Sequence, residues 1–133
     1  MLTIKLEDNC ADALAQMNIT PHPGASVMVM RDSGQVMGVG VMHLYDEYAV
    51  IDSIEVKDEF KDFSLEYGLG KAMLNAIDLK GIRYAVSHCV DLEKQLRALR
   101  FKAPSEWDDE QMPDNVANWE LCLNLDGYFT SNC

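Results

Sequence analysis

The feature that most restricts the fold is the order of three segments between residues 48 and 88. Residues 48–56 are rich in β-branched and aromatic side chains and contain no glycine or proline, which predicts a buried strand. A polar loop follows, and Tyr67-Gly-Leu-Gly-Lys71 leads into a helix with one apolar face that ends at Gly81. Residues 82–88 read as a second buried strand. A strand, helix and strand of this length predict a right-handed crossover between parallel strands.

The two glycines of this stretch, Gly68 and Gly70, are expected where the helix begins. The first turn of a helix carries N–H groups without intrahelical partners, so it can bind a phosphate if the chain approaches closely. A tight turn from strand to helix would use the same glycines, and the sequence leaves both interpretations open. Lys71 either reinforces such an anion site or is simply solvated.

Antiparallel pairing is expected before the crossover. Residues 26–30 and 36–44 flank a turn rich in polar residues and glycine, which predicts a hairpin, and the strand from Tyr48 continues it. Gly38 and Gly40 indicate a bulge or a closely approaching neighbour. His43, near the end of the same strand, is expected to be a half-buried packing residue.

The two ends of the chain each add a strand and a short helix. The alternation of residues 2–6 predicts an opening strand, and Asp8 or Asn9 is expected to cap the helix after it. Leucines spaced along residues 92–99 predict a helix capped by Asp91. Residues 119–125 alternate as a half-buried strand, whose apolar face fits a homodimer interface as well as a core. We expect residues 1–133 to form a single domain.

Composition excludes several classes of function. The formal net charge of -11 argues against nucleic acid as a partner and favours a cationic or amine-bearing one. Part of the acidic excess lies at residues 106–114, which we expect to be a solvated loop. The four cysteines are scattered, so no metal site is expected. We also expect no membrane span and, without a signal-peptide pattern, a cytoplasmic location.

The order of these elements, with the glycine motif, resembles the GNAT (Gcn5-related N-acetyltransferase) superfamily over residues 26–125. The resemblance implies an α/β (α+β) fold: a mixed, mostly antiparallel sheet with a central parallel strand pair, flanked by helices. It also implies an acetyl-CoA-dependent N-acetyltransferase acting on a small-molecule or protein amine. The positions matching the family's motif for the acetyl-CoA pyrophosphate are Leu65, Gly68 and Gly70. The implied cofactor-binding residues are Ile54, Val56, Tyr67, Gly68, Leu69, Gly70 and Lys71.

This sequence departs from the family's pattern at three positions. Leu65 replaces a basic or amide residue, Leu96 replaces the tyrosine that often protonates the leaving thiolate, and Arg100 replaces a glycine. The loop before Gly68 is also longer than the common form. These departures leave open a second interpretation, a catalytically inactive GNAT-like domain that binds CoA or a protein partner.

The chemistry implied by the resemblance is attack of an amine on a thioester. The amine must lose a proton, so a carboxylate or histidine is required near the acyl carbon. Acidic residues on the strand of residues 48–56 serve as the base in family members, which makes Glu55 the first candidate and Asp52 the second. Simple alternation places these two side chains on opposite faces of the sheet, unless a bulge intervenes. The general acid is left unassigned.

Overall fold

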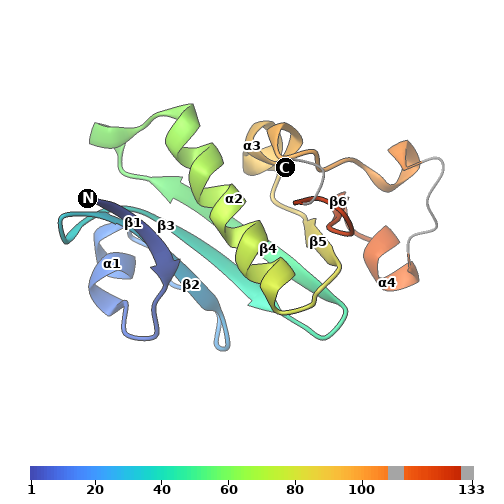
Figure 1. The fold of residues 1–133 in the computed structure, drawn as a ribbon, viewed down its shortest axis with the longest axis horizontal. Coiled ribbons are helices and arrows are strands. Elements are labelled where there is room, and N and C mark those ends of the chain that lie inside the picture. The colour runs from blue at the N-terminus through green and yellow to red at the C-terminus, as the bar shows by residue number, and fades with distance from the viewer. Residues whose placement is uncertain (108–112, 130–133) are drawn as a thin grey trace.

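The computed structural model describes residues 1–107 and 113–129, and its six strands form one sheet in the order β1-β2-β3-β4-β5-β6 (Figure 1). The strands are β1 (Leu2–Leu6), β2 (Ser26–Asp32), β3 (Gln35–Leu44), β4 (Tyr48–Val56), β5 (Tyr84–Ser87) and β6 (Leu121–Asn124). The α-helices are α1 (Ala11–Gln16), α2 (Phe63–Leu79), α3 (Glu93–Ala98) and α4 (Asp114–Ala117). Short 3-10 turns are η1 (Asp58–Phe60), η2 (Val90–Leu92) and η3 (Pro104–Glu106).

Only one pair of neighbouring strands in this sheet is parallel. β4 and β5 run in the same direction, joined by the crossover helix α2, and the other neighbouring pairs are antiparallel. The predicted mixed sheet with a central parallel pair is therefore confirmed. The predicted hairpin is also present as β2 and β3, with its turn at Ser33 and Gly34, both at positive φ.

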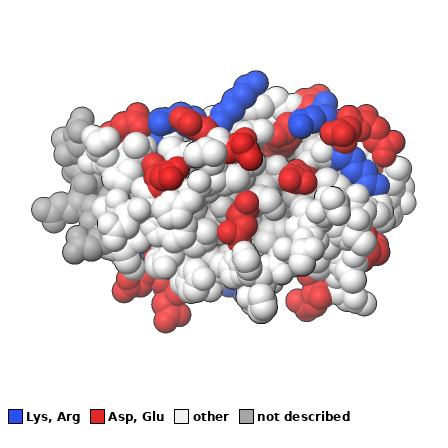
Figure 2. All heavy atoms as spheres, turned by 180° about the vertical axis from the view of Figure 1, so that it is seen from behind, with Lys and Arg blue, Asp and Glu red and all other residues white. Residues whose placement is uncertain are grey.

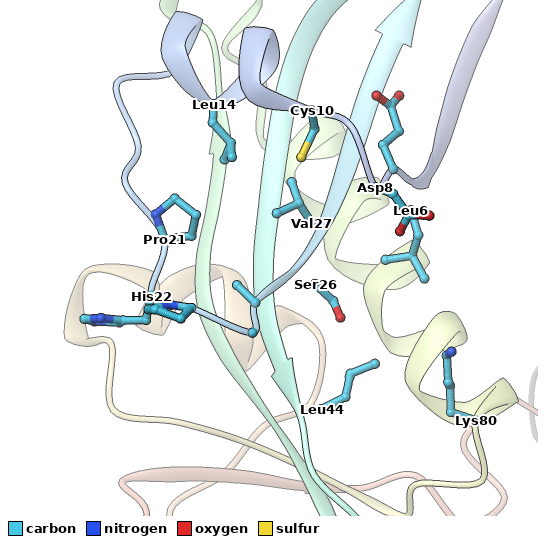
Figure 3. A pocket seen from close by; sticks show the side chains of 14 residues that line it. Leu6, Asp8, Cys10, Leu14, Pro21, His22, Ser26, Val27, Leu44 and Lys80 are labelled. Atoms are coloured by element: carbon cyan, nitrogen blue, oxygen red, sulfur yellow. The ribbon is translucent and has the colours of Figure 1, made fainter.

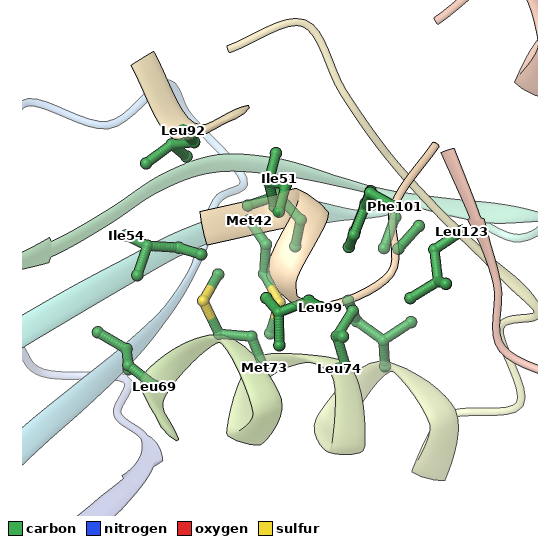
Figure 4. Packing of buried hydrophobic residues seen from close by; sticks show 14 of the residues in the cluster. Met42, Ile51, Ile54, Leu69, Met73, Leu74, Leu92, Leu99, Phe101 and Leu123 are labelled. Carbon is green, nitrogen blue, oxygen red and sulfur yellow. The ribbon is translucent and has the colours of Figure 1, made fainter. Parts of the chain in front are cut away.

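Helices cover both faces of the sheet. The largest cluster of buried side chains lies between the sheet and helices α2 and α3, where Leu69 and Met73 of α2 meet Met42, Ile54 and the α3 side (Figure 4). A second cluster packs α1 against valines of β2 and β3 on the opposite face. Gly40 allows the close approach of α2 to the sheet, because a Cβ there would collide with the Met73 side chain.

The expected caps of the two short helices are wrong. The N-cap of α1 is Cys10 and that of α3 is Leu92, and neither makes a side-chain capping hydrogen bond. Both helices bury apolar residues, Ala13 in α1 and Leu96 in α3. Packing of one face can hold such a short helix even where its first N–H groups lack a side-chain partner.

The expected start of α2 is also wrong, because the helix begins at Phe63, before the glycines. The side chain of the N-cap residue Asp62 accepts hydrogen bonds from the backbone N–H (2.7 Å) and the hydroxyl (2.8 Å) of Ser64. Such a cap is a strong local signal for a helix start. With 3.6 residues per turn, Gly68 and Gly70 lie in the second turn.

The acidic run falls partly outside the described residues, which exclude 108–112. Its first acid, Glu106, is exposed and forms an ion pair with Arg97 at 2.9 Å. Among the described helices, none is long and apolar enough to cross a membrane.

Candidate active site

The parallel strands β4 and β5 separate part-way along their length. Their backbone pairing covers Tyr48 to Val50 of β4. The last link is the hydroxyl of Ser87, which donates to the carbonyl of Ile51 at 2.9 Å. β4 then continues to Val56, while the chain after Ser87 turns into η2. The result is an open backbone edge on β4, the arrangement that an extended ligand chain can pair with.

A hollow of about 340 Å³ lies at this opening, and carboxylates dominate its charged lining. Four acids face it, Glu55, Asp58, Glu66 and Asp91, together with one lysine, Lys61. Glu66 is buried and accepts a hydrogen bond from Gln95. The field inside this hollow therefore favours neutral or cationic groups over anions.

A β-bulge interrupts β4 beside the opening. Val41 pairs with Ser53 and Met42 pairs with Ile51, so Asp52 is the extra residue on β4. Ile51 and Ile54 consequently share the core under α2, although they are three positions apart. This bulge is the exception that the expectation for Asp52 and Glu55 allowed for, because it shifts the alternation along β4 by one residue.

Asp52 forms a close pair with His43 of the neighbouring strand. His43 is aligned with Val50, and its Nδ1 lies 2.6 Å from Oδ2 of Asp52. The His43 side chain is 15% exposed and that of Asp52 is 35% exposed. Asp52 occupies Nδ1, so Nε2 is the ring nitrogen that can exchange a proton with a ligand. A histidine oriented by a carboxylate is a common general base.

The pair faces a second hollow, of about 330 Å³, with aromatic walls. Tyr45, Tyr48 and Trp119 line it with His22 and His43. Neighbouring rings in this group lie 5.2 to 6.4 Å apart between centroids. Aromatic faces and a carboxylate together suit an amine with an apolar or cationic body.

All three histidines of the chain lie in or beside this aromatic group. His88 stacks on Trp119 with ring centroids 4.1 Å apart, and its Nδ1 lies 3.9 Å from a carboxylate oxygen of Glu120. Among the described residues, no group of three or more His, Cys, Asp or Glu side chains could hold a metal ion.

A third hollow, of about 490 Å³, lies between the β1–α1 turn and the loop before β2 (Figure 3). His22, Lys80 and Cys10 line it from different parts of the chain. His22 also lines the aromatic hollow. The loop that carries His22 therefore separates the two hollows.

The face of the molecule turned away from α2 carries more acidic than basic groups, as expected for this composition. Figure 2 shows acidic side chains spread over this face, whereas basic ones gather along one edge. A cationic ligand is attracted to such a surface, and a polyanion is repelled.

The glycine motif is placed differently from a phosphate-binding turn. Gly68 is half-buried in the second turn of α2, and a Cβ there would meet nothing within 4 Å. At Gly70 a Cβ would lie 2.6 Å from Cδ1 of Leu99, so this glycine permits the contact between α2 and α3. Leu69 is fully buried, and the Lys71 ammonium lies 4.7 Å from the centre of the Tyr128 ring.

No protein-family model matches the chain. No curated protein sequence matches it either.

Three solved structures superpose on nearly the whole chain. A GNAT family acetyltransferase from Elizabethkingia anophelis with acetyl-CoA bound has a TM-score of 0.59 and 15% identity, covering 93% of this chain and 98% of its own. Tetrahymena GCN5 has a TM-score of 0.67 and 13% identity, covering 92% of this chain and 93% of its own. Mutant forms of the spermidine/spermine N-acetyltransferase SpeG from Vibrio cholerae have a TM-score of 0.67 and 10% identity, covering 100% of both chains.

The chain has the GNAT fold. These structural neighbours extend along the full chain and are acetyltransferases, at low identity, so the expectation of a divergent GNAT-like chain is confirmed for the fold.

The departures from the GNAT motif can now be located. Leu96 is completely buried, and its aliphatic side chain has no group for proton transfer. Arg100 follows α3 and adopts a positive φ of 78°, a conformation that glycine would hold with less strain. Leu65 lies in the first turn of α2 and packs against the core.

The structure separates the two predicted carboxylates. Asp52 lines the aromatic hollow and contacts His43, whereas Glu55 is exposed and lines the hollow at the strand opening. Their catalytic roles stay predictions, as do the cofactor-binding roles of residues 54–56 and 67–71. Sequence reasoning treated His43 as a packing residue and missed its pairing. Counting outward from the β3–β4 turn would have found it, since Val50 is opposite His43 and Asp52 is diagonal to it.

Proposed function

We propose that this chain is an N-acyltransferase that transfers an acyl group from a pantetheine thioester, such as acetyl-CoA, to an amine. The observation that carries the proposal is the adjacency of two features on β4. The strand has an open backbone edge beyond Ile51, and the His43–Asp52 pair lies at its bulge. An acyl donor along the edge and an amine in the aromatic hollow would meet near that bulge.

The pantetheine arm fits the strand opening on chemical grounds. Its two amides need backbone N–H and C=O partners, and the separated part of β4 at Ile54 to Val56 offers such groups. When bound, the thioester supplies an activated acyl carbon. A backbone N–H of this edge is a suitable donor to the oxygen that becomes negative during transfer.

The amine must lose a proton as it attacks, and His43 is the proposed base. Asp52 is a positioning residue in this scheme, since it acts by holding the imidazole ring and stabilising its protonated form. Water would return a proton to the departing thiolate, because Leu96 cannot. The alternative base is Glu55, which lines the strand opening itself.

The proposed acceptor is an amine with an aromatic or extended cationic body. The aromatic rings and Asp52 support this choice, together with the net charge of -11. Spermidine and phenethylamine represent the two kinds of body and serve as the first acceptors to test.

The deciding experiment measures thiol release from acetyl-CoA in the presence of each amine. We expect His43→Gln to lower kcat by about 10²- to 10⁴-fold, the usual contribution of a general base. Asp52→Asn should lower kcat less and change its pH profile. Glu55→Gln tests the alternative base, and we expect its kcat to stay close to that of the unmodified chain. A large loss in Glu55→Gln alone would make Glu55 the base and contradict the role of His43.

The second function to consider is a non-catalytic GNAT domain that binds a partner. The buried Leu96 favours it, because no residue stands ready to protonate a thiolate at that position. Absence of both thiol release and calorimetric binding at millimolar acetyl-CoA and acetyl-pantetheine would reject the transferase and leave this function.

A further inference from the structure

We propose that this chain recognises its acyl donor through the pantetheine arm alone, and that the nucleotide phosphates of CoA add no binding energy. The inference rests on the proposed transferase function and concerns the selectivity of its donor site. Its consequence is that acyl-pantetheine and related thioesters without a nucleotide should serve as donors about as well as acyl-CoA.

The first argument is the position of the glycine motif inside α2. A backbone N–H can cradle a phosphate only if it lacks a partner in its own helix, which restricts such groups to the first turn. Gly68 and Gly70 lie in the second turn of a helix that starts at Phe63. Their N–H groups therefore point along the helix axis to the preceding turn and are not available to a pyrophosphate.

The second argument is that the first turn of α2 is already capped by the chain itself. The backbone oxygen of Asp62 accepts from the N–H groups of Leu65 (3.0 Å) and Glu66 (3.1 Å), and its carboxylate accepts from the N–H of Ser64 (2.7 Å). These bonds from Ser64 lower the pKa of the Asp62 carboxyl, so it stays charged. A fixed carboxylate thus occupies the place where an anionic ligand would be stabilised by the helix dipole.

The third argument is the charge of the surroundings. The hollow at the strand opening has the carboxylates of Glu55, Asp58, Glu66 and Asp91 against the single ammonium of Lys61. Pantetheine is neutral, whereas the diphosphate and 3′-phosphate of CoA carry several negative charges. Repulsion between these charges and the lining acids should weaken binding of CoA, most strongly at low ionic strength.

Packing explains one glycine of the motif without a ligand and does not explain the other. Gly70 is required by the approach of Leu99, and Gly68 faces open space in which a side chain would fit. Helix packing therefore accounts for the glycine at position 70 of this motif.

The test compares kcat/KM for acetyl-CoA and acetyl-pantetheine with one amine acceptor, and calorimetric Kd values for CoA and pantetheine. We expect the kcat/KM values of the two donors to agree within about threefold. The Kd of CoA should fall as NaCl rises from about 20 to about 300 mM, while the Kd of pantetheine stays constant. A preference for CoA above about thirtyfold, weakened by salt, would overturn the inference and leave the transferase function intact. Binding and turnover of neither donor would overturn both.

Two variants sharpen the comparison. Gly68→Gln adds a neutral side chain where the phosphate cradle would be, and we expect it to change neither Kd by more than about twofold; a selective loss of CoA binding would contradict the inference. Asp62→Asn keeps a capping oxygen but removes the charge, so CoA affinity should rise about twofold to fivefold relative to pantetheine. The control is Asp46→Asn, which makes an equal charge change in the β3–β4 turn. It should leave the ratio of CoA affinity to pantetheine affinity unchanged.

Discussion

At the scale of single residues, the two glycines of the motif in α2 differ in the space that surrounds them. Gly68 has free space around the position of a Cβ, whereas Gly70 stands against Leu99 in the core. The sequence offers no way to distinguish them, because both lie in the same local pattern. The difference comes from α3, which lies more than twenty positions further along the chain.

This difference predicts opposite responses to alanine. Gly68→Ala should raise the free energy of unfolding by about 0.5–1 kcal/mol, because alanine has the better helix propensity and no collision follows. Gly70→Ala should not show this gain, because Leu99 is buried and must shift. We expect its free energy of unfolding to be about 1–3 kcal/mol lower than that of Gly68→Ala. Urea unfolding of both variants measures the difference, and equal stabilities would show that Leu99 can move without cost.

The same scale contains the proposed base. His43 and Asp52 are ordinary strand residues when considered separately, and only their contact at 2.6 Å gives them a chemical role. Asp52 lies diagonal to His43 across the strand pair, because Val50 is aligned with His43.

At the scale of elements, the β1–α1 turn is tied to β2 by a charged pair. The guanidinium of Arg31 donates to both carboxylate oxygens of Glu7, each at 2.9 Å, and both side chains are mostly buried. The hydrogen bond from Arg31 lowers the pKa of the Glu7 carboxyl from its ordinary value of 4.5. A carboxyl with a lowered folded-state pKa contributes stability that is complete above its unfolded pKa and is lost as the pH falls through the folded value.

This pair predicts a pH-dependent effect of Glu7→Gln. At pH 7 the variant should lose about 1–2 kcal/mol of unfolding free energy, the usual worth of a partly buried, charge-assisted pair. The difference between variant and parent should shrink as the pH falls below 4.5, where Glu7 of the unfolded chain becomes protonated, towards the lowered pKa of the folded state. Urea unfolding at pH 7 and pH 3.5 measures both values, and a constant difference would show that the pair contributes through packing only.

At the scale of the whole molecule, the acidic surface predicts how an acceptor amine is captured. The net charge of -11 attracts cations over a distance of about one Debye length, which falls from roughly 20 Å at low salt to about 8 Å at physiological salt. We expect KM for spermidine to rise severalfold between about 20 and about 300 mM NaCl, with kcat nearly constant. Acyl-transfer rates at both salt concentrations provide the measurement. A KM independent of salt would mean that the acceptor is held by aromatic contacts alone.

The fold was largely determined by local pattern. The alternation of residues 2–6 and 26–44, the apolar run of residues 48–56 and the helical spacing of residues 69–77 predicted strands and helices that the structure contains. The length of the segment between β4 and β5 then implied a parallel crossover. These signals are readable from the sequence because each depends on neighbours a few positions away. The start of α2 could also have been predicted from local sequence, since Asp62 and Ser64 form an N-cap signal. The prediction placed the start at the glycines instead.

The site depended on contacts that no local pattern records. The bulge at Asp52, the pairing of that residue with His43 and the approach of Leu99 to Gly70 each join separate elements. A shift of one residue in strand register reverses which face a side chain occupies, so sequence spacing alone could not place Asp52 and Glu55. Sequence thus determined which elements form and in which order, because periodicity is local. Tertiary structure alone decided which side chains meet at β4, because packing and register are set by the whole sheet.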